Sequence, residues 1–267
     1  MPINWNEVNQ ALSPIKDYED LFRRLRESFA YPFVSENYNF SMPELANYTQ
    51  RLLGGDSRRR YVEYVTWLTR VLTELHQAGV INTQVLIAKV ETREQLEVFT
   101  EQSGVHAQDV VAVLKYLIYW VIPMKKPLSG LVREELLTRD AIKVLRELGI
   151  STNLELLQQG ITATGLKALA DSSGLPETVI LNLVNLADFS RLPWASKATI
   201  ANIMGAGYRS LAQLANANPE QLFADFFRYG KAIGKNLKLG NEIENSYPCI
   251  KRGAHQERKT VFRREKR

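Results

Sequence analysis

The sequence contains very little cysteine and histidine. Among its 267 residues there is one cysteine, Cys249, and the three histidines, His76, His106 and His255, lie far apart. A single cysteine cannot form a disulfide within the chain, and widely separated histidines do not have the spacing of zinc ligands. We therefore predict no disulfide framework, no metal site and no cofactor.

Long hydrophobic runs are also lacking. The longest one, Val110 to Met124, spans 15 residues and contains Lys115, whereas a transmembrane helix needs about 20 apolar residues. The first residues of the chain show no basic segment followed by an apolar one, so we expect no signal peptide. These absences predict a cytoplasmic protein without a membrane span, in which 110–124 forms a buried helix.

Motifs of known catalytic sites are missing. The sequence has no Gly-rich phosphate loop, no Gly-x-Ser-x-Gly elbow and no His-Glu-x-x-His segment. Asp188 lies three residues before Arg191, a spacing that favours an ion pair or a helix cap over a catalytic role. We expect no small-molecule substrate and predict that the protein is not an enzyme.

Positive charge is abundant only near the C-terminus. The net charge is +5, but residues 228–267 contain 12 basic and 4 acidic side chains, a net charge of +8. The other 227 residues therefore sum to −3. Such a gradient is typical of a protein that binds a polyanion, because each neutralised phosphate releases counterions.

Apolar residues recur with helical spacing along nearly the whole chain, and strand patterns are almost absent. Ser41 and Glu44 have the spacing of a capping box at a helix start, and 31–40 before them is expected to be a loop. A long helix is predicted to end near Ala78, and its expected apolar stripe is Val62, Val65, Leu68, Leu72 and Leu75. The sequence predicts an all-α fold.

A weak internal repeat runs through the middle of the chain. A shift of 70 residues aligns 79–124 with 149–194 without a gap, and identical residues fall on turn glycines and core leucines. A partial third copy begins at Gly207. Short helices separated by tight turns are typical of helix-hairpin-helix units, so we predict tandem units of this kind.

Residues 149–222 contain several distinctive short segments. These are Gly149-Ile150-Ser151-Thr152, Gly160-Ile161-Thr162, Ser173-Gly174-Leu175, and Asn185-Leu186-Ala187-Asp188 followed by Arg191. The stretch resembles the domain of unknown function 4332, a bacterial family with a tandem helix-hairpin-helix-like fold. The resemblance implies that fold, a degenerate copy at 79–124 and, by analogy alone, contact with DNA or RNA.

One turn departs from the pattern of helix-hairpin-helix DNA binders. These proteins hold a phosphate with the backbone of a Gly-x-Gly hairpin, whereas 192–197 contains no glycine. The Cβ atoms there hinder the close approach that glycine allows. We therefore expect this phosphate contact to be lost, and Ser196 to cap a helix that contains Ile200 and Ile203.

These patterns divide the chain into four predicted segments. Residues 1–55 form an N-terminal helical segment, 56–135 the degenerate helix-hairpin-helix-like repeat, 136–227 the tandem that resembles the family, and 228–267 a basic helix end and tail.

The predicted nucleic-acid contacts lie in the last segment. Four basic residues at positions i, i+3, i+7 and i+10, which are Arg228, Lys231, Lys235 and Lys238, are expected to share one face of a helix that starts near Pro219. The tail adds Lys251, Arg252, Arg258, Lys259, Arg263, Arg264, Lys266 and Arg267. Arg58, Arg59 and Arg60 form a secondary basic cluster, and Trp194 and Phe262 are candidate protein contacts.

Two functions remain open from the sequence. The first is a non-enzymatic protein that binds the DNA or RNA backbone through its basic C-terminal helix face and tail, with little sequence specificity. The second is an adaptor or assembly subunit that docks its helical repeats and tail on a protein complex with an acidic surface.

Overall fold

The protein is almost entirely helical. The computed structural model describes residues 3–53, 59–132, 136–192 and 195–237. Over these residues there is no strand, and extended backbone pairs only in two isolated bridges, Ser41 with Asn82 and Pro127 with Thr152. The predicted all-α fold is confirmed.

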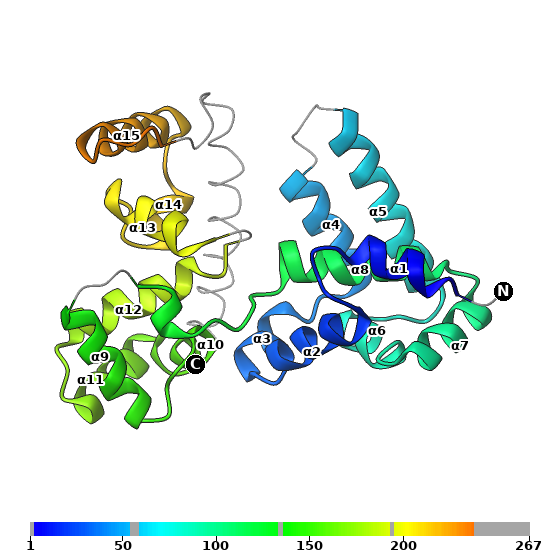
Figure 1. Ribbon diagram of the computed structural model, residues 1–267, viewed down its shortest axis with the longest axis horizontal. Coiled ribbons are helices and arrows are strands. Elements are labelled where there is room, and N and C mark those ends of the chain that lie inside the picture. The colour runs from blue at the N-terminus through cyan, green and yellow to red at the C-terminus, as the bar shows by residue number, and fades with distance from the viewer. Residues whose placement is uncertain (1–2, 54–58, 133–135, 193–194, 238–267) are drawn as a thin grey trace. The chain divides into compact units, whose positions relative to one another are not determined.

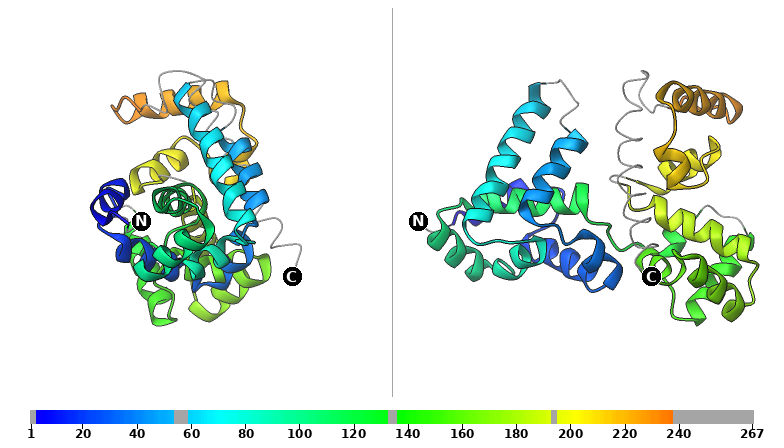
Figure 2. Two further views of the ribbon diagram at one scale, coloured as in Figure 1. Left: turned by 90° about the vertical axis from the view of Figure 1, so that its right-hand side faces the viewer. Right: turned by 180° about the vertical axis from the view of Figure 1, so that it is seen from behind.

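Two compact units make up the chain, Met1–Met124 and Lys125–Arg267. The helices of the first unit, coloured from blue to green in Figures 1 and 2, are α1 (Trp5–Leu12), α2 (Tyr18–Phe29), α3 (Pro32–Tyr38), α4 (Met42–Leu53), α5 (Arg59–Gln77), α6 (Thr83–Lys89), α7 (Arg93–Ser103), α8 (Ala107–Tyr116) and the π-helix η1 (Leu117–Val121). The run 110–124 lies within α8, η1 and the residues that follow, and Val110, Leu114 and Leu117 are fully buried.

The second unit contains the 3₁₀-helix η2 (Leu128–Gly130) and seven α-helices among its described residues. These are α9 (Leu136–Glu147), α10 (Asn153–Gly160), α11 (Ala163–Ser173), α12 (Glu177–Phe189), α13 (Lys197–Gly205), α14 (Leu211–Ala215) and α15 (Pro219–Ala232), shown in green to orange in Figure 1. Among all described helices, none combines the length and the apolar character that a membrane crossing requires. The predicted four-segment division is finer than the two units and stays a prediction.

Two local expectations are wrong. Residues 32–38, expected to lie in a loop, form α3, because Pro32 begins the helix and Phe33, Val34 and Tyr38 bury one face of it. Val62 was expected on the buried stripe of α5, but 51% of its surface is exposed. Correct helical phase buries a side chain only where another element packs against that turn, as it does at Val65 and Leu68.

The helices from α5 to α8 and from α9 to α12 have the same spacing. Helices α6, α7 and α8 begin at Thr83, Arg93 and Ala107, and α10, α11 and α12 each begin 70 residues later. Gly79 and Gly149, which follow α5 and α9, both have a φ angle of +79°, which glycine adopts without the steric cost of a Cβ atom. The degenerate copy and the helix-hairpin-helix classification stay predictions.

A capping box begins α10. Thr152 accepts a hydrogen bond from the Glu155 amide at 3.4 Å, and the Glu155 carboxylate accepts from the Thr152 and Ser151 amides at 2.9 and 2.7 Å. Burial alone raises the pKa of Glu155, but the hydrogen bonds from Ser151 and Thr152 outweigh burial and lower the pKa. The folded state therefore stabilises the ionised carboxylate.

This capping box predicts a pH dependence of stability. Because the pKa of Glu155 is lower in the folded than in the unfolded chain, its contribution is present above pH 4.5, the ordinary pKa of glutamate, and is lost as the pH falls through the folded pKa. Between pH 5 and 3, the Tm of the wild type should fall more than that of Glu155→Gln. Glu177→Gln, the same change on an exposed glutamate at the start of α12, is the control, and parallel Tm curves for wild type and Glu155→Gln would contradict the prediction.

Candidate nucleic-acid interface

Helix α15 carries the described part of the predicted interface. Its start is defined by Asn218, whose side chain accepts hydrogen bonds from the amides of Glu220 and Gln221 at 2.8 and 3.3 Å, and by Pro219 in the first turn. Leu222 and Phe226 are buried on its inner side. The predicted helix start near Pro219 is confirmed.

The opposite side of α15 presents one aromatic and two basic side chains. Ala224, Phe227, Arg228 and Lys231 are exposed and lie on one face of the helix, which we name the α15 outer face. Phe227 is 65% exposed, and the Arg228 side chain is 73% exposed. Lys231 lies in the last turn, where a positive charge is favoured by the helix dipole.

Arg228 is held at the surface by Asp225. A guanidinium nitrogen lies 2.9 Å from the Asp225 carboxylate, of which 16% is exposed. That carboxylate also accepts hydrogen bonds from the Tyr208 hydroxyl at 3.0 Å and from the side-chain Nε2 of Gln221 at 2.7 Å. Asp225 is thus fixed by three groups, and it orients the guanidinium with most of its surface in solvent.

The prediction that Lys235 continues the helical face is wrong. Helix α15 ends at Ala232, and Gly234 has a φ angle of +64°. The Lys235 amide then donates a hydrogen bond to the Gly230 carbonyl at 2.8 Å, which closes the helix end. Lys235 is exposed, but it follows the helix instead of extending the face formed by Arg228 and Lys231.

Comparison with known proteins assigns this part of the chain. Residues 135–240 match the family model described as Domain of unknown function (DUF4332). The second unit carries a DUF4332 domain. The match extends the segment 149–222, on which the resemblance was recognised, at both ends, so the DUF4332 domain includes α9 to α15. No curated protein and no solved structure matches the chain.

The positive charge of the chain is confined to the last part of the second unit. Residues 1–124 contain 12 basic and 15 acidic side chains, a net charge of −3, whereas 125–267 contain 22 and 14, a net charge of +8. Within the second unit, 125–227 is neutral with ten of each sign. The surplus therefore begins at Arg228, on α15, the last described helix.

A buried polar cluster supports the end of α12 in the DUF4332 domain. The Arg191 guanidinium, with a side chain that is fully buried, donates through Nε to the Asp188 carboxylate at 2.7 Å. The predicted partnership of Asp188 with Arg191 is confirmed. The Lys126 ammonium donates to the carbonyls of Ala195 and Ser190 at 2.8 and 3.2 Å, and burial lowers its pKa. All of these hydrogen bonds join groups of the second unit, so Arg191 and Lys126 have a structural role.

The turn after α12 has the predicted cap. Ser196 accepts a hydrogen bond from the Thr199 amide at 3.1 Å and begins α13, in which Ile200 and Ile203 are buried. The loss of a Gly-x-Gly phosphate contact at this turn, part of which lies outside the described residues, stays a prediction.

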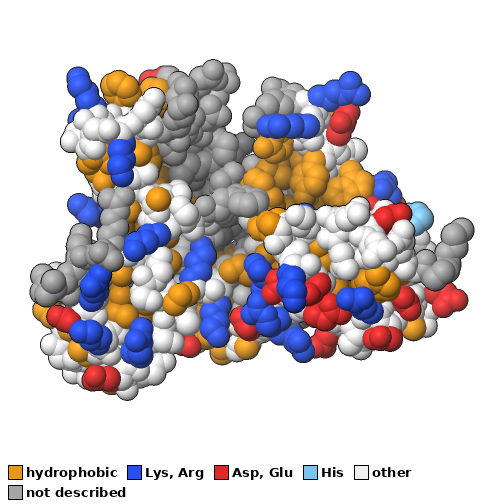
Figure 3. Space-filling view, viewed as in Figure 1, with side chains coloured by type: hydrophobic (Ala, Val, Ile, Leu, Met, Phe, Trp, Pro, Cys, Tyr) orange, Lys and Arg blue, Asp and Glu red, His pale blue; other side chains and the backbone are white. Residues whose placement is uncertain are grey.

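Basic residues of the first unit are mostly paired. In α5, the Arg59 guanidinium donates to Glu63 at 2.7 Å, and Arg60 lies over the Tyr61 ring, 5.1 Å from its centroid. Figure 3 shows basic and acidic side chains interleaved on the visible face of this unit, whereas the visible face of the DUF4332 domain carries more Lys and Arg than Asp and Glu.

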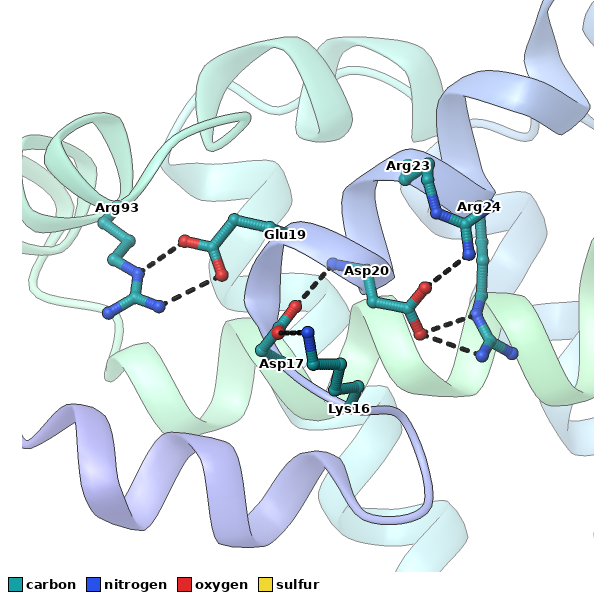
Figure 4. A network of polar contacts seen from close by, with 7 residues as sticks. All are labelled: Lys16, Asp17, Glu19, Asp20, Arg23, Arg24 and Arg93. Carbon is teal, nitrogen blue, oxygen red and sulfur yellow. Dashed lines mark hydrogen bonds and ion pairs between the residues drawn. The ribbon is translucent and has the colours of Figure 1, made fainter.

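Figure 4 shows a polar network that joins α2 to α7 in the first unit. Arg93 donates to both oxygens of Glu19 at 2.7 and 3.0 Å and lies over the Trp5 ring, and its hydrogen bonds lower the pKa of Glu19. Arg24 pairs with Asp20 at 2.8 Å in the same network. The side chains of Arg93 and Arg24 are 35% and 40% exposed, against 73% for Arg228, so this network is a weaker phosphate candidate than the α15 outer face.

Several predicted site residues lie outside the described part of the chain. They are Arg58, Trp194, Lys238, Phe262 and the basic residues of the tail from Lys251 to Arg267. Within the described ranges, no group of His, Cys, Asp and Glu side chains is arranged to hold a metal ion.

Sequence reasoning missed Phe227. The signal was the pair Phe226-Phe227, because two adjacent helical residues point about 100° apart and cannot both lie on the stripe that contains Leu222 and Phe226. The structure shows which of the two phenylalanines is buried, since Phe226 is 4% exposed and Phe227 is 65% exposed.

Proposed function

We propose that this protein is a non-enzymatic nucleic-acid-binding protein. Its DUF4332 domain contacts the phosphate backbone of DNA or RNA through the α15 outer face and the basic residues that follow. The observation that carries the proposal is the exposure of Arg228 and Lys231 on one helix face, at the point of the chain where the positive surplus begins.

The Asp225 ion pair leaves Arg228 available to a phosphate. Ion pairs of an exposed guanidinium contribute only about 0–1 kcal/mol, while a phosphate accepts two parallel hydrogen bonds from the same fork. Phosphate contacts position a nucleic acid without reading its bases. We therefore expect little sequence specificity.

Neutralising the basic pair of α15 tests the proposal. In the full chain, Arg228→Gln with Lys231→Gln should weaken binding to a labelled oligonucleotide. It should also reduce the slope of log affinity against log salt by about 1 for each phosphate contact removed. Fluorescence anisotropy between 50 and 300 mM salt measures both quantities.

A matched control lies in the first unit. Arg59→Gln with Arg60→Gln removes the same charge from the exposed start of α5 and should leave the slope nearly unchanged. An equal effect of the two double variants would refute a localised interface. Absence of any binding by the wild type to DNA or RNA at 50 mM salt would refute the proposed function.

The adaptor alternative is favoured by one observation, the exposed Phe227, since aromatic and Arg side chains together are typical of protein interfaces. A pull-down with and without nuclease separates the two functions. A stoichiometric protein partner with an acidic surface that persists after nuclease treatment would support the adaptor, and loss of every partner would support nucleic-acid binding.

A further inference from the structure

Phe227 is the most exposed of the large hydrophobic side chains in the described residues. At 65% exposure it exceeds Ile81 at 59%, and both Val62 and Val98 at 51%. An isolated exposed apolar residue is ordinary on a protein surface. Phe227 differs from the others because a basic residue follows it directly and a second one lies a single helical turn further on, at Arg228 and Lys231.

We propose that Phe227 is a stacking platform for an unpaired base, and that the α15 outer face therefore prefers single-stranded nucleic acid. This inference rests on the proposed function and names its substrate class. A ring that is 65% exposed and shares a helix face with two cations matches the arrangement by which single strands are held, in which bases stack on aromatic side chains and cationic groups contact the backbone.

The geometry of α15 keeps both contacts available at once. Residues i and i+4 of a helix have Cβ atoms about 5–6 Å apart, so Lys231 lies beside Phe227 on the helix surface. Arg228 is oriented by the 2.9 Å ion pair with Asp225, and Asp225 is itself fixed by Tyr208 and Gln221. A base on the Phe227 ring therefore has its flanking phosphates within reach of two long basic side chains.

A duplex uses this surface less well. Its bases are stacked on one another and present only their edges in the grooves. An aromatic side chain reaches a base face in a duplex only by unstacking a base step, which opposes binding. A single strand requires no such step, so the contribution of the ring should appear with single strands and be nearly absent with duplexes.

The test compares two probes and matched variants of the full chain. The probes are a labelled 20-nucleotide oligo(dT) and a labelled blunt-ended duplex of two separate strands with a similar number of phosphates, measured by anisotropy at 50 mM salt. Phe227→Ala should weaken binding to oligo(dT) about tenfold and binding to the duplex less than about twofold. Phe227→Leu keeps an apolar side chain without a ring and should lose as much, whereas Phe227→Trp should retain the affinity.

The outcomes distinguish failure of the stacking role from failure of the proposed function. Binding of both probes with equal losses in Phe227→Ala, or binding of oligo(dT) that Phe227→Ala leaves unchanged, would overturn the stacking role while leaving the proposed function intact. Full affinity in Phe227→Leu would show a merely apolar contact and would also overturn stacking. No binding of either probe by the wild type would overturn both. Since Phe227 is exposed, unchanged circular dichroism should show that all three variants fold.

Discussion

Replacing Arg191 by methionine is expected to destabilise the DUF4332 domain by about 3–5 kcal/mol. The guanidinium is fully buried and pairs with Asp188, whose side chain is 9% exposed. Methionine fills a similar volume but leaves the carboxylate without its cation in a region of low dielectric constant. Breaking one side of a buried pair is costly because the remaining charge has lost its solvation and is not compensated.

A double variant separates loss of the pair from loss of volume. Asp188→Leu with Arg191→Met removes both charges, and buried pairs replaced by apolar residues of similar size are often nearly neutral in stability. The chain offers its own comparison, because the positions 70 residues earlier are Ile118 and Val121, which are 5% and 3% exposed. The double variant should recover most of the stability that Arg191→Met loses.

Hydrogen exchange measures this effect within the full chain. Amides of α10 and α12 in the second unit should exchange faster in Arg191→Met, whereas amides of α5 and α8 in the first unit serve as the internal control. Equal protection of α12 in the wild type and in Arg191→Met would show that the ion pair contributes little. A double variant as unstable as Arg191→Met would show that packing, and not the unpaired charge, is responsible.

Deleting residues 251–267 should produce the largest change in nucleic-acid binding. This segment has eight basic and two acidic residues, and it lies outside the described part of the chain. A plot of log affinity against log salt has a slope of about −0.7 to −0.9 per neutralised phosphate. If half of the basic residues contact phosphates, the deletion should flatten the slope by on the order of 3.

Two variants of unchanged length control for the shortening of the chain by the deletion. A tail with the same composition in scrambled order should retain the wild-type slope, since phosphate contacts do not depend on sequence. A tail in which the eight basic residues are glutamine should behave like the deletion. If the scrambled tail also loses the slope, a specific contact with a protein or a base is required, and backbone binding by the tail is wrong.

Local sequence signals predicted the helices well where capping chemistry is explicit. Ser41 with Glu44, Ser196 and Asn218 all begin helices as expected, because their side chains satisfy backbone amides within a few residues. The interpretation of 31–40 as a loop failed because its aromatic and proline residues were read without knowing that Phe33 and Tyr38 would be fully buried. Burial of one face stabilised a helix that local propensity did not indicate.

The candidate interface was predicted only in part. Composition placed the positive surplus in residues 228–267 and identified Arg228 and Lys231 as candidates. The helix end at Ala232 was not predicted, because the left-handed conformation of Gly234 and the closing hydrogen bond from the Lys235 amide to the Gly230 carbonyl are properties of the folded backbone. The exposed ring of Phe227 was missed although the helical phase of Leu222 and Phe226 indicates that Phe227 lies off the buried stripe.

The sequence by itself determined the all-α class, the helix starts, the Asp188–Arg191 pair and the position of the basic surplus. These features depend on side-chain chemistry, on 3.6-residue periodicity and on contacts between residues close together in the chain. Tertiary structure alone decided that Val62 faces solvent, that Asp225 orients Arg228, and that Lys126 supports the end of α12. Exposure and long-range polar contacts depend on which elements pack together, and no local pattern contains that information.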